Sequence, residues 1–132
     1  MPFFDKPQLK PDHWEMLVLS VLAEGQAYGY AISKAVAARS DNTLSLAPSQ
    51  LYPLLKRLEK QGLVSASWEE VKAEGADPEA DGRRRKWYTL SAKGRKRLTQ
   101  RIEAHRRFNA IIESFIGGAG GGAPDTRTGA AS

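Results

Sequence analysis

The chain has 132 residues with a net charge of +5, and 41% of the residues are hydrophobic, a composition typical of one small globular domain rather than of a disordered chain. The absence of cysteine excludes disulfide bonds, cysteine-ligated zinc and thiol catalysis. The longest strongly apolar run, residues 16–23, falls far short of the roughly 20 residues that span a bilayer, and no signal-peptide pattern precedes it, so we expect a cytoplasmic protein without a membrane partner.

Two helices are predicted in the first third of the chain. Residues 1–11 lack periodicity and are expected to form an N-terminal arm. Asp12 is a candidate N-cap, with Glu15 completing a capping box, and the apolar residues that follow recur at helical spacing. The same spacing predicts a second helix over residues 28–39, and the alternating residues 43–46 predict a short strand.

The third predicted helix has an apolar side and a basic side. We expect a regular helix over residues 50–61, after an irregular first turn that accommodates Pro48 and Pro53. At about 100° per residue, its leucines lie on one side, while Lys56 and Lys60 lie on the other. The leucines should therefore face a core and the cations should face solvent.

Two strands and a long loop are predicted next. Residues 63–68 and 86–90 alternate between apolar and polar side chains, as strands do. The intervening loop is acidic over residues 69–81 and then becomes basic. Residues 83–107 carry eleven Lys and Arg side chains against the single Glu103, a segregation that can steer a polyanion to one face of the molecule. The alternative is an ordinary solvated surface.

A final helix is expected over residues 91–116, capped by Ser91, and the Gly- and Ala-rich residues 117–132 are expected to be disordered. The fold class predicted is α+β, mainly α. It is a winged helix-turn-helix over residues 12–90 with a two- to three-stranded wing, followed by the long C-terminal helix.

The final helix carries a coiled-coil pattern. The seam residues are spaced alternately by four and three, and two of them are polar: Leu98, Ile102, His105, Asn109, Ile112 and Ile116. Phe108, Ile111 and Phe115 widen its apolar side. The pattern predicts that this helix forms a homodimer, in which a buried Asn109 would fix the register. The alternative is that the stripe packs only on its own domain.

Catalytic chemistry is not indicated. The two histidines have no ligand-spaced partner, and the glycine run after residue 116 lacks the strand, helix and Lys-Ser/Thr of a phosphate-binding loop. The carboxylates cluster in a loop that offers no means of separating their pKa values. We therefore predict no enzyme activity, no metal and no cofactor.

Binding to double-stranded DNA requires features that the chain does have. A major groove admits one helix, whose outward side chains near the N-terminus contact bases, and a basic wing contacts the neighbouring minor groove. The side chains predicted to contact DNA are Ser49, Gln50, Tyr52, Lys56, Arg57 and Lys60 on the helix and Arg83, Arg84, Arg85 and Lys86 on the wing.

Four motifs occur in the order and spacing of a known family: Tyr-Gly-Tyr-Ala-Ile at residues 28–32, residues 48–58 with the core Leu-Tyr-Pro-Leu-Leu-Lys-Arg-Leu, Gly-Leu-Val at residues 62–64, and residues 83–94. The chain resembles PadR-like winged-helix transcriptional regulators. The resemblance implies a dimeric DNA-binding repressor of the compact branch, with a single C-terminal dimerisation helix. Tyr30, inside the first motif, completes the predicted DNA-contacting set.

Three hypotheses follow for function. The first is a homodimeric repressor on a roughly palindromic operator. The second is a winged-helix module that binds a protein partner through its basic surface, without specific DNA binding. The third, suggested by the resemblance, adds a small aromatic effector that binds near Trp14 and Phe108 and releases the repressor.

Overall fold

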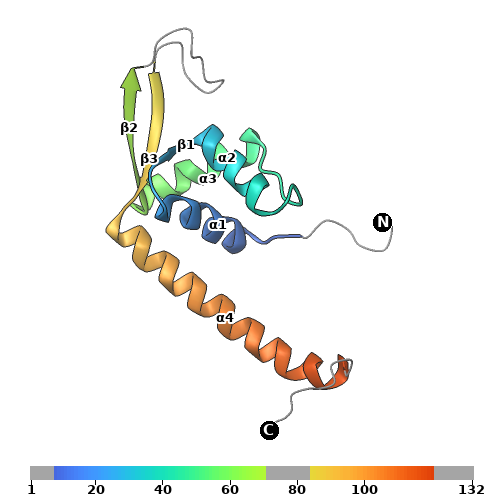
Figure 1. Ribbon diagram of the computed structural model, residues 1–132. Coiled ribbons are helices and arrows are strands. Elements are labelled where there is room, and N and C mark those ends of the chain that lie inside the picture. Colours follow the sequence, from blue (N-terminus) through green and yellow to red (C-terminus); the bar gives the residue numbers. More distant parts are fainter. Residues whose placement is uncertain (1–7, 71–83, 121–132) are drawn as a thin grey trace. The chain divides into compact units, whose positions relative to one another are not determined.

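The computed structural model describes residues 8–70 and 84–120 (Figure 1). The elements are, in order, α1 (Pro11–Ala23), β1 (Ala27–Tyr28), α2 (Gly29–Arg39), α3 (Pro48–Lys60), β2 (Val64–Glu70), β3 (Arg84–Leu90) and α4 (Ala92–Gly120). They belong to two compact units, residues 1–99 and 100–132, so the start of α4 lies in the first unit. In the described ranges, no helix is long and apolar enough to cross a membrane.

The sheet is antiparallel, with β3 in the centre and the order β1-β3-β2. Its register places Val64 opposite Leu90, and Tyr28 opposite Trp87. Val64, Tyr88 and Leu90 are buried on the face that packs against the helices, because side chains alternate between the two faces of a strand. Three helices against a small sheet, followed by a long helix, form a winged helix-turn-helix, which confirms the predicted fold class.

The core of the first unit is built mainly from leucines of α1 and α3. The largest fully buried side chains are Leu19, Leu22, Ile32, Leu51, Leu55, Leu58, Leu63 and Val18. The inward side predicted for the third helix is confirmed, since all four of its leucines are buried. Burial of each such side chain stabilises the fold by about 1.5–3 kcal/mol.

The prediction of a strand at residues 43–46 was wrong, and the third strand is instead β1. Leu46 is buried as part of the core, and the backbone around it is hydrogen-bonded by side chains of α2 and of the residue that follows it. The Ser40 hydroxyl accepts a hydrogen bond from Leu44 N at 2.9 Å, and the Ser33 hydroxyl donates one to the Leu46 carbonyl at 3.1 Å. These bonds hold residues 43–46 as a connecting loop.

The predicted start of the first helix was also wrong. The helix begins at Pro11, with Lys10 rather than Asp12 as the N-cap. Proline is favoured at the first helical position because its fixed φ suits the helix and the amide that it lacks would have no helical partner. Lys10 N donates to His13 Nδ1 at 3.1 Å. The side chain of Glu15 does not close a capping box; it is buried and accepts from Arg97.

The third helix begins at Pro48, with Ala47 as its N-cap, and Pro53 lies inside it. The prediction of an irregular first turn followed by a helix from residue 50 was therefore wrong. The proline costs one intrahelical hydrogen bond, but the buried leucines stabilise the continuous helix by more than that bond. Gln50 Oε1 accepts from Ala47 N at 3.3 Å, which gives the helix start a partner although Ala47 has no capping hydroxyl.

Glycine ends this helix and turns the chain into the sheet. Gly62 has a φ of 78°, a left-handed conformation that favours glycine. Leu63 N donates to the Leu58 carbonyl at 2.9 Å and Gly62 N donates to the Glu59 carbonyl at 3.0 Å, the two bonds of a Schellman motif. The Ser91 hydroxyl donates to the Gly62 carbonyl at 2.6 Å, so the start of α4 is fixed to the end of α3.

The predicted cap of the final helix is confirmed, because Gly94 N donates to Ser91 Oγ at 2.9 Å. The helix runs to Gly120, four residues beyond the predicted end, so disorder over residues 117–120 was a wrong prediction. The predicted disorder at residues 121–132, the arm at residues 1–7 and most of the acidic loop at residues 71–81 lie outside the described residues.

An ion pair between Arg97 and Glu15 joins α1 to the start of α4. Arg97 Nη1 donates to Glu15 Oε2 at 3.2 Å, and Glu15 is only 4% exposed. Arg97→Met should lower the free energy of unfolding by about 2 kcal/mol, because the buried carboxylate loses this cation. Urea unfolding measures the change. The double variant Glu15→Leu/Arg97→Met should recover most of the loss, and a double variant as unstable as the single one would contradict the assignment.

Candidate nucleic-acid interface

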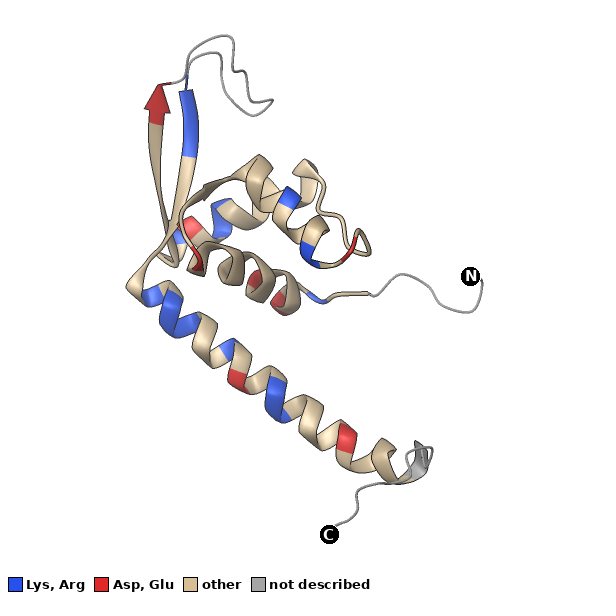
Figure 2. Ribbon diagram, in the orientation of Figure 1, with Lys and Arg blue, Asp and Glu red and all other residues tan. Residues whose placement is uncertain are grey.

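The face of α3 opposite the buried leucines is polar and basic. Five of the predicted DNA-contacting side chains are exposed there: Ser49, Gln50, Lys56, Arg57 and Lys60. Figure 2 shows the Lys and Arg positions of α3 and the basic start of β3. Tyr30, on α2, is also exposed, and the Lys34 ammonium lies 5.4 Å from the centre of its ring. An outward helix face of this kind can enter a major groove.

Tyr52 differs from the other predicted α3 contacts. Its hydroxyl oxygen is buried, although the residue is partly exposed. Helical geometry predicts that Tyr52 lies at the edge of the outer face. At that position a small rotation of the side chain determines whether the hydroxyl faces solvent or the protein. The structure turns the hydroxyl inward, so it is not presented to a phosphate.

The basic residues of the wing point in different directions, because successive strand residues face opposite sides of the sheet. Arg84 is exposed, and its guanidinium carbon lies 4.3 Å from the centre of the Trp68 ring. Arg85 lies on the other face, 4.5 Å from the centre of the Tyr28 ring. Lys86 pairs with Glu59 of α3 at 3.3 Å. Arg83 lies outside the described residues.

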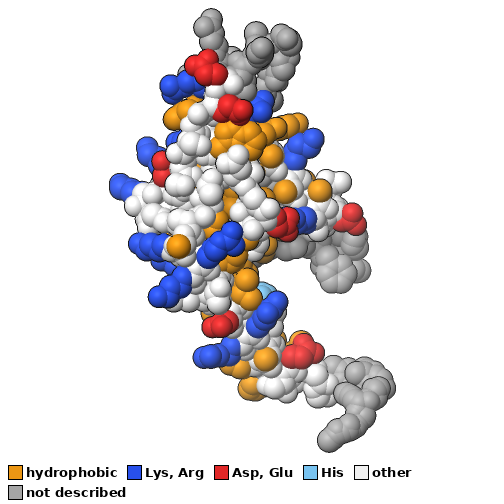
Figure 3. Space-filling model, turned by 60° about the vertical axis from the view of Figure 1, so that its left-hand side comes forward, with side chains coloured by type: hydrophobic (Ala, Val, Ile, Leu, Met, Phe, Trp, Pro, Cys, Tyr) orange, Lys and Arg blue, Asp and Glu red, His pale blue; other side chains and the backbone are white. Residues whose placement is uncertain are grey.

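Lys86 was therefore predicted as a DNA contact but has an ionic partner within the fold. Trp68 was not predicted as part of the site, yet it is 51% exposed beside Arg84 and Lys86. Figure 3 shows exposed hydrophobic side chains among Lys and Arg side chains near the upper end of the hairpin. The sequence carried a signal that could have revealed Trp68. It is an aromatic residue near the end of one predicted strand, and the start of the next strand has cations two residues apart, at Arg84 and Lys86.

Trp14 borders a shallow cavity of about 170 Å³ at one side of α3. The cavity is lined by Pro11, Trp14, Leu46, Gln50, Leu54 and Arg57. Two predicted base-contacting side chains, Gln50 and Arg57, thus border the same hollow as an indole. Phe108, the other predicted effector contact, belongs to the second unit, where it is exposed.

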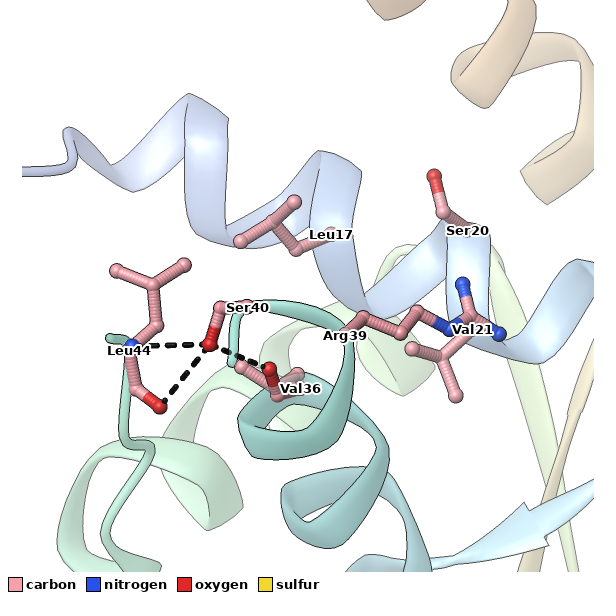
Figure 4. A pocket seen from close by; sticks show the side chains of 7 residues that line it. All are labelled: Leu17, Ser20, Val21, Val36, Arg39, Ser40 and Leu44. Carbon is pink, nitrogen blue, oxygen red and sulfur yellow. Dashed lines mark hydrogen bonds between the residues drawn. The ribbon is translucent and has the colours of Figure 1, made fainter. Parts of the chain in front are cut away.

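A larger cavity of about 230 Å³ lies between α1 and α2 (Figure 4). It is lined by Leu17, Ser20, Val21, Val36, Arg39, Ser40 and Leu44. The Ser40 hydroxyl donates to the Val36 carbonyl at 2.9 Å and accepts from Leu44 N, while Arg39 pairs with Glu24. These polar groups are already used within the fold, so we assign no ligand to this cavity.

The second unit is helical over residues 100–120 and exposes an apolar stripe. Its exposed large hydrophobic side chains are Phe108, Ile111, Ile112, Phe115 and Ile116, and Ile102 is partly exposed. His105 Nε2 and Asn109 Nδ2 lie 3.0 Å apart, so the two polar seam residues contact each other. Leu98 was predicted in the same seam but is buried in the first unit, with 8% of its surface exposed.

A winged helix with an exposed basic third helix and a basic hairpin defines the class of DNA-binding transcriptional regulators. The model of the transcriptional regulator PadR-like family matches residues 18–100. Because this match covers more than half of the chain, the chain belongs to the PadR-like family. The family is one of transcriptional regulators, not of enzymes.

Solved structures are similar to the chain over most of its length. A transcriptional regulator from Clostridium thermocellum is 27% identical, with 80% of this chain and 94% of that chain covered and a TM-score of 0.67. A PadR family regulator from Eggerthella lenta is 32% identical, covering 78% and 80% of the two chains with a TM-score of 0.58. An uncharacterized protein of Lysinibacillus sphaericus is 27% identical over 106 residues, 80% of this chain and 90% of its own.

Proposed function

We propose that the chain is a sequence-specific repressor that binds a roughly palindromic operator as a homodimer in the cytoplasm. The observation that carries the proposal is the solvent-exposed face of α3, with Gln50 and Arg57 beside Lys56. Gln pairs bidentately with adenine and Arg with guanine in the major groove, while Lys holds phosphates. The face thus offers both base contacts and phosphate contacts.

The apolar stripe of the second unit supports the homodimer. Monomeric soluble proteins rarely expose contiguous apolar surface, and a stripe with alternating spacing of three and four residues suits a second copy of the same helix. A two-fold dimer presents two recognition helices, and the half-sites of its operator are then about one helical turn apart.

Selection from genomic DNA fragments at about 150 mM salt tests the proposal. We expect enrichment of a two-fold symmetric site. Uniform weak retention that disappears with added salt would contradict sequence-specific regulation. Stoichiometric capture of a protein partner, without any shift of DNA, would instead select the interaction-module alternative.

Arg57→Ala should relax base preference at one position of each half-site. A bidentate contact to guanine discriminates by about 1–3 kcal/mol, so that the substitution should bring the affinities for the operator and for its single-base variants together. Arg84→Ala is the control, because loss of a phosphate contact weakens all sequences alike. Binding titrations on a panel of operator variants measure both effects. Unchanged discrimination in Arg57→Ala would mean that another surface contacts the bases.

The proposed aromatic effector would release the repressor by binding beside Trp14. This proposal rests on the cavity that Trp14 shares with Gln50 and Arg57, since a ligand there would touch side chains needed for DNA. Titration with aromatic acids and cationic dyes should quench tryptophan fluorescence saturably, and Trp14→Phe should remove the response. The absence of saturable quenching throughout the series would rule out this part of the proposal.

A further inference from the structure

We infer that Trp68 is a positioning residue of the DNA interface, whose indole holds the Arg84 guanidinium ready to bind a phosphate of the duplex. The inference rests on the proposed function and deepens it, because it assigns a role to a side chain that does not itself have to touch DNA. Four observations carry it: the cation–π contact between Arg84 and Trp68, the exposure of the indole, the face of the sheet, and a link to α3.

The contact between Trp68 and Arg84 follows from the register of the hairpin. Trp68 is opposite Lys86, and Arg84 is two residues away along β3, so Trp68 and Arg84 are diagonal neighbours on one face. The Arg84 guanidinium carbon lies 4.3 Å from the centre of the Trp68 ring, well within the range of a cation–π contact. The indole remains 51% exposed, so core packing does not account for it.

The same face of the hairpin continues from the core out to Trp68. Val64 and Tyr88 are buried on this face, and strand alternation places Trp68 and Arg84 on it as well. Lys86 lies on this face too, between Arg84 and Tyr88 along β3, and it pairs with Glu59 at 3.3 Å, which fixes this face on the side of α3. The wing therefore presents Arg84 on the same side of the sheet as the recognition helix.

A chain of contacts links α3 to Arg84. Glu59 holds the Lys86 ammonium, which lies 5.6 Å from the centre of the Trp68 ring, and the Arg84 guanidinium carbon lies 4.3 Å from the centre of the same ring. The indole is thus fixed relative to α3 through a cation that is already paired. This arrangement sets the position of Arg84 with respect to the helix that enters the major groove.

A cation–π contact suits an arginine that must bind phosphate. A guanidinium held over an aromatic face has no carboxylate on its N–H donors, so these remain available for bidentate contact with phosphate. Restricting its rotamers before binding reduces the entropy that binding costs. An ion pair with a carboxylate would restrict the arginine too, but it would occupy those donors. Glu70 is directly opposite Arg84 in the register, so the cation–π contact with Trp68 bears on which partner the guanidinium takes. Trp68 therefore orders Arg84 without competing for it.

Binding to a mixed-sequence duplex of about 30 base pairs tests the inference, because phosphate contacts do not depend on sequence. By fluorescence anisotropy at low salt, Trp68→Leu should bind about fivefold more weakly than wild type and show a shallower dependence on salt. Trp68→Phe should retain most of the affinity, since it keeps an aromatic face. Ser67→Leu, at the exposed neighbouring position on the opposite face, is the matched control and should bind as wild type does. Thermal unfolding of each variant checks the fold.

The double variant Trp68→Leu/Arg84→Ala separates positioning from direct contact. If Trp68 acts through Arg84, the double variant should bind no more weakly than Arg84→Ala alone. Additive losses would overturn the inference, because Trp68 would then contact DNA itself. If the wild type binds the duplex and Trp68→Leu binds it with equal affinity, only the inference about Trp68 is overturned. If the wild type does not bind the duplex, the proposed function is overturned as well.

Discussion

Replacing Gly94 with alanine is expected to lower the free energy of unfolding of the first unit by about 3 kcal/mol or more. A Cβ atom at this position would lie 2.0 Å from the Leu63 carbonyl oxygen and 2.6 Å from Leu90 Cδ1. The first of these neighbours is backbone, and it also accepts the Ser91 N–H at 3.0 Å. The clash therefore cannot be relieved by rotating a side chain, and the start of α4 must move away from the end of α3.

Gly117→Ala provides the matched control within the same helix. No atom outside the local helix lies within 4 Å of a Cβ built at Gly117. The substitution should be neutral or stabilise the helix by up to about 1 kcal/mol, because alanine has the higher helix propensity. Urea unfolding followed by circular dichroism compares the two variants. Similar stability of Gly94→Ala and Gly117→Ala would contradict the close approach of α4 to the Leu63 carbonyl.

Hydrophobic periodicity was sufficient to predict most of the fold. The spacing of the α3 leucines predicted which side is buried. Ser91 was predicted as a helix cap because serine is favoured at that position, and its hydroxyl accepts from the Gly94 amide in the structure. The two-residue strand β1 gave no local signal, since Ala27 and Tyr28 are a strand only through their pairing with β3. Pairing with a distant segment cannot be inferred from the spacing within a short one.

The candidate site was predictable in outline and not in its internal contacts. The outward face of α3 follows from helical geometry alone, which is why the exposure of Lys56 and Arg57 agrees with expectation. Arg84, Arg85 and Lys86 formed one basic run in the sequence, but the strand separates them onto two faces. Their partners come from three different elements of the fold. Only tertiary structure shows that a cation is already paired within the protein.

Ile112→Glu should convert the proposed homodimer into monomers. Ile112 lies in the predicted seam and is exposed in the single chain, so a carboxylate there would be buried without a cation when two helices pair. A buried unpaired charge costs several kcal/mol, and two copies of it meet across a two-fold axis. Light scattering coupled to size-exclusion chromatography measures the change in mass.

Specific DNA binding should fall with the dimer. A monomer contacts one half-site of the operator, whereas the dimer contacts two. The affinity for the selected operator should therefore drop by about 100-fold or more at nanomolar protein concentration. Weak binding to mixed-sequence DNA should persist. Ala110→Glu introduces the same charge at an exposed position on the opposite side of the helix, and it should leave both the mass and the affinity unchanged. Two results would contradict the role of the C-terminal helix in pairing the two copies of α3. In the first, Ile112→Glu remains dimeric. In the second, it becomes monomeric but keeps full operator affinity.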